Sequence, residues 1–167
     1  MLAAARIEEV DPALRGVVML ARGDRKQARR ALEEARKRGD NRKEVVGPLI
    51  QILIEEGEIA RASAVALDIV ESLSDEDTRK MAQIAFEGGA FDWSARLYEA
   101  VFAREGQADD AYEAARAAAK DGQDEKALRL LRNAVEAGFS DRARAWSDAA
   151  LSALQREQGL ETVVPRP

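Results

Sequence analysis

The sequence predicts an all-α fold of about four antiparallel helix hairpins, stacked into a superhelix and closed by a C-terminal capping helix. Three observations support this prediction. The 167 residues are 46% hydrophobic but only 5% aromatic, and 34% are charged, which is typical of helices packed closely through small side chains. Glycines recur at near-constant spacing. Between them, apolar residues recur three and four positions apart, as on one face of a helix.

The repeat is anchored by four glycines, each predicted to end the first helix of a unit. These are Gly23, Gly57, Gly89 and Gly122, which are 34, 32 and 33 residues apart. Five residues after each glycine stands a small residue, and the set is Ala28, Ala62, Ser94 and Ala127. Because this register does not slip, we expect four copies of one structural unit.

Helix geometry explains the spacing. Positions three and four apart share a face, so each helix offers one apolar stripe, with small residues where two backbones approach closely. Glycine tolerates the positive φ of a helix C-terminus. The polar turn that follows, for example "GQDEKA" from Gly122, is so short that it predicts an antiparallel hairpin. One hairpin cannot bury its apolar face alone, so neighbouring hairpins must stack.

Several residues of the fourth unit resemble the tetratricopeptide repeat family. They are the glycine corner followed by Ala127, Leu131 and Ala134, with Ala115 before it, and the other units match at the same positions. The resemblance implies a right-handed superhelix whose first helices line a concave surface that contacts a protein or peptide. The second unit departs from the pattern at Ile50, Ala66 and Pro48, so we expect it to pack irregularly.

The chain is predicted to have four parts. Residues 1–10 form the tail helix of a truncated preceding repeat, and residues 11–140 form the four repeats. Residues 141–158 form the capping helix, after an "AVEAGFSD" stretch that resembles the closing unit of many bacterial repeat proteins, and residues 159–167 form a flexible tail. Two alternatives remain open for the front: a fragment of a longer protein, or a natural start whose orphan helix packs elsewhere.

The resemblance implies which side chains face the concave groove. The partner-binding candidates are Gln51, Glu55, Arg79, Gln83, Glu87, Tyr112, Arg116 and Lys120, preceded in the first unit by Val17 and Leu20. In this register the groove runs from apolar through acidic to basic, which could set the direction of a bound peptide. The alternative is that these exposed faces are charged for solubility alone.

Two further observations bear on the ligand. Glu55 and Glu56 stand at a predicted helix C-terminus, where the helix dipole disfavours anions by about 0.3–1 kcal/mol each. We therefore expect a compensating cation from a neighbouring helix or from a basic or amidated ligand. The family's clamp for acidic chaperone peptides needs asparagines in the row that Val17, Gln51 and Gln83 occupy here, so that ligand is not expected.

Two stretches receive a plainer interpretation. Residues 22–43 carry ten Lys or Arg against four Asp or Glu. This basic run is interpreted first as a solvated face, with contact to anionic lipid, nucleic acid or an acidic partner as alternatives. Trp93, Tyr98 and Phe102 lie near helical spacing with Phe91 close by, and they are expected to belong to the core.

The composition excludes many function classes. The chain has no Cys and no His, so thiol nucleophiles, catalytic triads and zinc sites built on these residues are absent. We expect no enzymatic activity, cofactor or metal. A net charge of −5 argues against nucleic acid as the main partner, and no apolar run approaches the length of a membrane span. No compartment is indicated, and the cytoplasm is the default expectation.

The sequence therefore predicts a protein-interaction scaffold that binds a partner protein or peptide on its concave face. Two alternatives remain open. The repeats could be a regulatory or assembly segment of a larger enzyme or membrane-anchored protein. They could also form a homo-oligomer through the orphan helix of residues 1–10.

Overall fold

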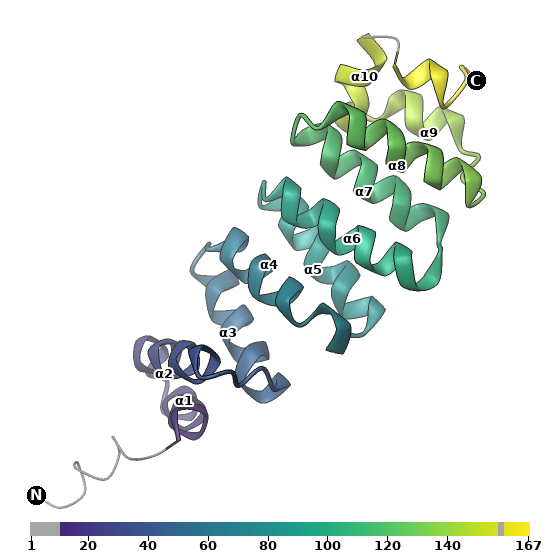
Figure 1. The fold of residues 1–167 in the computed structure, drawn as a ribbon. Coiled ribbons are helices and arrows are strands. Elements are labelled where there is room, and N and C mark those ends of the chain that lie inside the picture. The colour runs from purple at the N-terminus through teal and green to yellow at the C-terminus, as the bar shows by residue number, and fades with distance from the viewer. Residues whose placement is uncertain (1–10, 157–158) are drawn as a thin grey trace, which may run out of the picture. The chain divides into compact units, whose positions relative to one another are not determined.

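The structure is a computed structural model that describes residues 11–156 and 159–167 (Figure 1). Every regular element in these ranges is helical, which confirms the predicted all-α class. The predicted tail helix of residues 1–10 lies outside the described residues. The α-helices are α1 (Pro12–Ala21), α2 (Arg25–Lys37), α3 (Lys43–Glu55), α4 (Ile59–Asp68), α5 (Asp75–Glu87), α6 (Phe91–Glu105), α7 (Ala108–Lys120), α8 (Asp124–Glu136), α9 (Arg142–Ser147) and α10 (Ser152–Arg156).

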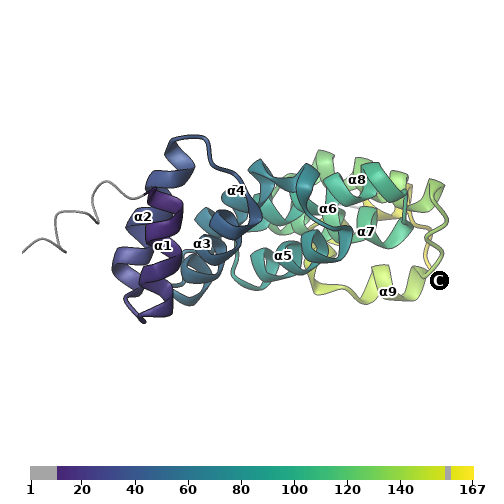
Figure 2. The same ribbon diagram turned by 90° about the horizontal axis from the view of Figure 1, so that it is seen from below.

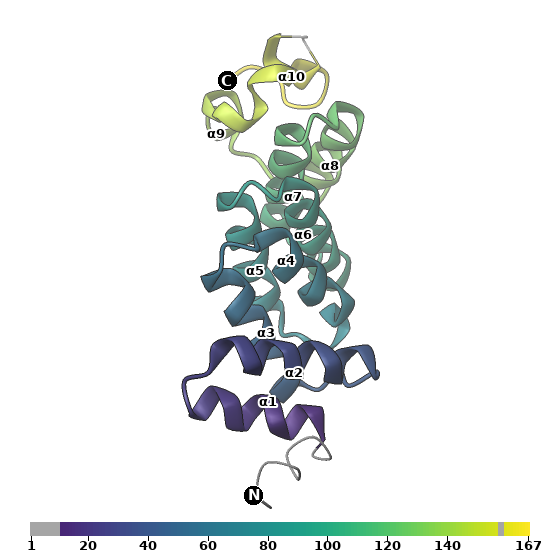
Figure 3. The same ribbon diagram turned by 90° about the vertical axis from the view of Figure 1, so that its left-hand side faces the viewer.

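The chain divides after Ile69 into two compact units. The first unit holds two hairpins, α1 with α2 and α3 with α4, and Figure 3 shows α1 and α2 side by side and antiparallel. Asp11 and Asp24 start its first two helices by accepting hydrogen bonds from the backbone N–H groups of Ala13 and Gln27, as N-caps do. Helix α3 continues through Pro48, although proline cannot donate the backbone hydrogen bond that this position normally makes.

The second unit holds the hairpins α5 with α6 and α7 with α8. Each helix packs on the next along the chain, α5 on α6, α6 on α7 and α7 on α8 (Figure 2). The core of this unit is built largely from small side chains, and six alanines of α7 are buried. Alanine at these positions lets the helix backbones approach closely, as the register of the repeats predicts.

The four predicted glycine corners have one geometry. Their φ values lie between 76° and 78°, in the left-handed region that glycine adopts without a steric penalty. At each corner the residue after the glycine donates a backbone hydrogen bond to a carbonyl five residues earlier, for example from Gln123 to Ala118 at 2.9 Å. This is the hydrogen bond of a Schellman motif. The predicted hairpin corners are therefore confirmed.

The C-terminal segment differs from the prediction of one capping helix over residues 141–158. Two short helices, α9 and α10, are separated at Asp148, whose backbone is extended (φ −75°, ψ 114°), and by a 3₁₀ turn over Ala149–Leu151. Asp148 caps this turn because its Oδ1 accepts from the N–H of Ala150 at 2.9 Å. A residue that caps a new helical segment cannot continue the preceding helix, so the single-helix prediction was wrong.

The prediction of a flexible tail over residues 159–167 was also wrong. A 3₁₀ turn forms at Leu160–Thr162, and the side chains of Leu160 and Val164 are buried. The indole Nε1 of Trp146 donates to the carbonyl of Val164 at 3.0 Å, and the Arg166 guanidinium lies over the indole ring. Burial of two aliphatic side chains supplies the free energy that orders this segment.

The aromatic residues are less buried than the sequence predicted. Tyr98 is 8% exposed and belongs to the core, whereas Phe91, Trp93 and Phe102 are only half-buried. Phe91 meets the ring of Phe86 edge-on, and Arg96 lies over the ring of Trp93. The sequence spacing predicts that these side chains belong to one helix. It does not predict how deeply each is buried, because burial depends on the neighbouring helices.

Candidate functional site

The candidate site is an open hollow of about 650 Å³ in the second unit. We call it the α5–α7 hollow, because its walls come from the first helices of two successive hairpins, with one residue from α6. Four predicted groove residues line it: Arg79, Gln83, Glu87 and Arg116. The other lining residues are Glu76, Lys80, Phe86, Tyr98, Asp109, Asp110 and Glu113. The structure thus brings these four residues, which come from two different helices, to one hollow.

Arg79 fastens the two walls of the hollow to each other. Its Nε and Nη2 donate to the two carboxylate oxygens of Asp110, both at 2.8 Å, and Nη2 also lies 2.6 Å from Glu105. The side chain of Asp110 is only 5% exposed, and its carboxylate is satisfied by the paired geometry that arginine offers. Arg79 is therefore a structural clamp between α5 and α7, and its charge is compensated within the chain.

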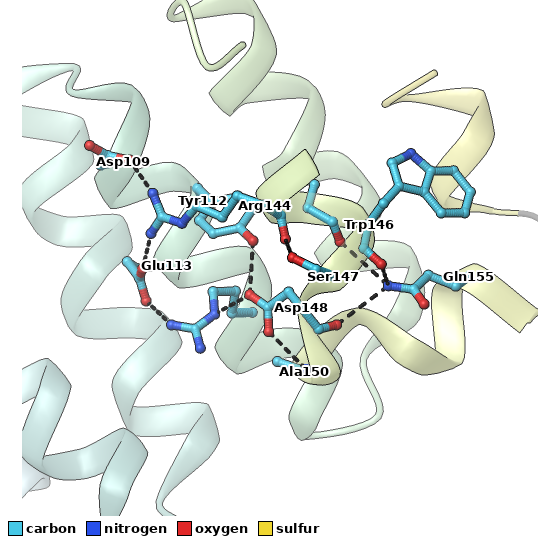
Figure 4. Close-up of polar contacts among 11 residues, drawn as sticks. Asp109, Tyr112, Glu113, Arg144, Trp146, Ser147, Asp148, Ala150 and Gln155 are labelled. Atoms are coloured by element: carbon cyan, nitrogen blue, oxygen red, sulfur yellow. Dashed lines mark hydrogen bonds and ion pairs between the residues drawn. The ribbon is translucent and has the colours of Figure 1, made fainter. Parts of the chain in front are cut away.

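A second polar network ties the C-terminal segment to α7 (Figure 4). The guanidinium of Arg144 contacts Asp109 at 2.9 Å and Glu113 at 2.7 Å. Arg116 also pairs with Glu113, and its Nε lies 2.6 Å from Oδ2 of Asp148. The carboxylates of Glu113 on α7 and of Asp148, just after α9, thus flank Arg116, and its Cζ lies 4.9 Å from the centre of the Phe86 ring.

Tyr112 is not a groove residue, because its side chain is fully buried. Its ring stacks on Phe139 with centroids 4.3 Å apart, and the Arg144 guanidinium lies 4.4 Å from the ring centre. The hydroxyl donates to Oδ2 of Asp148 at 2.8 Å. The prediction that Tyr112 contacts a partner was therefore wrong: the C-terminal segment covers it.

Lys120 is exposed but does not line the hollow. Its Nζ lies 5.5 Å from the centre of the Phe91 ring, which is a weak cation–π distance. In the hollow itself, the amide Nε2 of Gln83 donates to the carboxylate of Glu87 at 2.9 Å. Gln83 and Glu87 are four residues apart and share one face of α5.

Gln51 and Glu55 belong to the first unit. There the amide Nε2 of Gln51 donates to Glu55 at 3.1 Å, and Arg25 of α2 lies 2.8 Å from the same carboxylate. Arg29 of α2 pairs with Glu56 and, at 2.6 Å, with Glu58. The compensating cations expected for Glu55 and Glu56 therefore come from the neighbouring helix, and these two residues give no reason to expect a basic ligand.

The same contacts explain much of the basic run over residues 22–43. Its arginines on one side of α2 pair with acidic residues of the second hairpin, for example Arg36 with Asp68 of α4. These ion pairs show that the uneven distribution of charge along the sequence in part produces attraction between neighbouring hairpins.

In the first hairpin, Val17 is 44% exposed and Leu20 is half-buried.

Residues that sequence reasoning missed are Asp110, Glu113 and Asp148. The partners Arg79 and Asp110 are 31 residues apart, and Tyr112 and Asp148 are 36 apart, close to one repeat length. For Arg79 and Asp110, opposite charges at this separation were the available signal.

Burial raises the pKa of Tyr98 to about 12, and the nearby carboxylate of Glu113 adds to the effect. Burial also raises the pKa of Tyr112, and so does its hydrogen bond to the Asp148 carboxylate. Both environments disfavour the tyrosinate anion. A raised folded-state pKa contributes stability that is complete below the unfolded pKa and is lost as pH rises through the folded pKa.

We therefore expect alkaline stability to be limited by these two tyrosines, the only ones in the chain. Stability should not depend on tyrosine ionisation below about pH 10, the pKa of an unfolded tyrosine, and should fall as pH rises from there through about 12. Titration by tyrosinate absorbance, read beside circular dichroism, measures both. Ionisation of either tyrosine at about pH 10 in the folded chain would contradict the burial described here.

The residues that the structure describes contain no cluster of acidic side chains arranged to hold a metal ion. Within the same ranges, no helix is both long and apolar enough to cross a bilayer. The α5–α7 hollow presents charged and hydrogen-bonding side chains on its walls.

No protein-family model and no curated protein matches the sequence. Among solved structures, the chain is similar to MamA 41-end from Desulfovibrio magneticus RS-1, with a TM-score of 0.47 and 19% identity over 92% of this chain and 90% of that one. It is also similar to the MamA RS-1 ArsTM double mutant, with a TM-score of 0.42 and 18% identity over 92% and 95% of the two chains. No conclusion about family or function rests on likenesses this distant.

Proposed function

We propose that this chain is a non-enzymatic protein-interaction scaffold whose α5–α7 hollow receives a segment of a partner protein. The observation that carries the proposal is that Arg79, Gln83, Glu87 and Arg116, four of the groove candidates named from the sequence, line one open hollow on the first helices of two successive hairpins. A site built from rigid helices is pre-organised, and pre-organisation lowers the entropy cost of binding.

The ion pairs of the hollow support a binding role. Arg79 is held by Asp110 and Glu105, and Arg116 by Glu113 and Asp148. These contacts hold the two walls of the hollow in place, so the binding surface is already formed in the free protein. Gln83 and Glu87 stay exposed between the clamped walls, and they are the polar groups best placed to form new hydrogen bonds.

Blocking the hollow should weaken binding strongly. Short peptides of randomised sequence are incubated with the immobilised full chain, and the amount retained is measured for Gln83→Trp and for Arg132→Trp. Arg132 is an exposed residue of α8 that lines a separate surface hollow, so it is a matched control. We expect Gln83→Trp to weaken retention at least tenfold, roughly 1.4 kcal/mol, and Arg132→Trp to leave it unchanged.

Equal retention by the unmodified chain and Gln83→Trp would place binding elsewhere and contradict the proposal. So would an equal loss in both variants. Circular dichroism of each variant shows whether it keeps its helical fold. The narrower hypotheses, a regulatory segment of a larger protein and self-association through residues 1–10, stay predictions; the second is tested by light scattering of the full chain over a range of concentrations.

A further inference from the structure

The chain carries the same Gln–Glu pair twice, and the two copies differ in one respect. Gln51 with Glu55 and Gln83 with Glu87 stand six and two residues before their corner glycines, Gly57 and Gly89. In both copies the glutamine amide donates to the glutamate carboxylate, at 3.1 and 2.9 Å. Each glutamate is the last residue of its helix, α3 or α5, where the helix dipole disfavours an anion.

In the first unit this unfavourable placement is compensated. Arg25 of α2 lies 2.8 Å from the carboxylate of Glu55. In the second unit, no described residue forms an ion pair with Glu87. The cations lining the hollow have other partners: Lys80 pairs with Glu76 at 2.6 Å, and Arg79 and Arg116 are held by the carboxylates named above. Lys120 does not line the hollow, and its Nζ lies 5.5 Å from the centre of the Phe91 ring.

The hollow as a whole is also acidic. Five of its lining residues are Asp or Glu and three are Lys or Arg. Because each of those three cations already contacts at least one carboxylate, an arriving group meets a net negative potential with Glu87 as the carboxylate lacking a cation. Such a site attracts a positive group and repels a negative one.

We propose that the α5–α7 hollow recognises a Lys or Arg side chain of the partner segment, which binds against Glu87. This inference rests on the proposed function, since it states what the bound segment must carry. The cation donates to the Glu87 carboxylate and to the amide oxygen of Gln83, whose nitrogen is already committed to Glu87. Phe86 and Tyr98 line the same hollow and offer ring surface to the aliphatic stem of the side chain.

The first test needs no ligand, because an uncompensated carboxylate at a helix C-terminus costs stability. We expect Glu87→Gln to raise the melting temperature by about 1–3 °C. Glu55→Gln is the matched control: it removes the same dipole repulsion but also the ion pair with Arg25, so it should give no increase. A melting temperature lowered by Glu87→Gln would show that Glu87 is already compensated and would overturn the inference.

The second test reads the chemistry of the bound segment. Randomised peptides retained by the full chain are sequenced, and we expect Lys and Arg to be enriched about fivefold over the input pool, as for an exposed ion pair worth up to about 1 kcal/mol. Glu87→Gln should remove this enrichment, and Glu55→Gln should keep it. Enrichment of Asp or Glu, no charge preference, or enrichment indifferent to Glu87→Gln would each overturn the inference.

The two proposals fail in different ways. In one outcome the unmodified chain retains peptides, Gln83→Trp does not, and the retained peptides show no preference for Lys or Arg. This outcome would support the proposed function and contradict the inference of a bound basic side chain. If no peptide is retained, or if Gln83→Trp retains as much peptide as the unmodified chain, both the proposed function and the inference are contradicted. Self-association, checked by light scattering, would show whether a second copy of the chain is the source of the basic segment.

Discussion

Replacing Asp148 with alanine is expected to release the C-terminal segment from α7. The carboxylate caps the N–H of Ala150, accepts from the hydroxyl of buried Tyr112 and pairs with Arg116. Loss of an N-cap costs about 1 kcal/mol, and a buried hydroxyl without a partner costs about 1–3 kcal/mol. We expect a destabilisation of about 3 kcal/mol, a roughly hundredfold increase in the opening equilibrium of this segment.

Hydrogen exchange of the amides of α9 and α10 measures this opening directly. Asp148→Asn is the matched control: its one side-chain oxygen can still cap Ala150, and its amide N–H can donate to the Tyr112 hydroxyl in place of the hydrogen bond that Oδ2 accepts, while the charge opposite Arg116 is lost. We expect it to cost about 1 kcal/mol, since Arg116 keeps its second carboxylate, Glu113. Equal protection of this segment in Asp148→Ala and the unmodified chain would contradict the described network.

Truncating Leu131 should destabilise the second unit strongly. Its side chain is fully buried on α8, and replacing a buried leucine with alanine costs about 2–5 kcal/mol through lost transfer free energy and a residual cavity. For a chain of this size we expect the melting temperature of Leu131→Ala to fall by roughly 6–12 °C, taking 3 kcal/mol as the central value. Thermal unfolding followed by circular dichroism gives the value.

Val135 provides the comparison one helical turn further along α8. It is 40% exposed, so Val135→Ala should change stability by less than about 0.5 kcal/mol. Similar losses at positions 131 and 135 would contradict the difference in burial between these two side chains. A large loss at Leu131 alone supports the repeat register, which places this leucine nine residues after Gly122.

Where the sequence predicted the fold well, the determining physics is local. The corner glycines could be recognised because only a positive φ lets the chain leave a helix in this way, and all four adopt it. The row of Gln83 and Glu87 could be recognised because residues four apart share a helix face. Both rules need only the order of residues within one hairpin.

Where the prediction was wrong, the cause lies in contacts between distant parts of the chain. Tyr112 has the position of a groove residue in its own helix, but Phe139, Arg144 and Asp148 cover it. The predicted capping helix is interrupted at Asp148, because its carboxylate accepts hydrogen bonds both from the Tyr112 hydroxyl and from the N–H of Ala150. The tail is ordered because Leu160 and Val164 find a core to enter.

The sequence by itself determined the helices of the four hairpins, their glycine corners and the shared face of Gln83 and Glu87 on α5, because each depends on backbone geometry and on periodicity within a few turns. Only the tertiary structure decided which charged side chains form ion pairs within the chain. Glu55 acquires Arg25, whereas Glu87 in the equivalent position acquires no described cation. Identical local patterns thus differ in electrostatic state, because an ion pair requires two side chains that only packing brings within reach of each other.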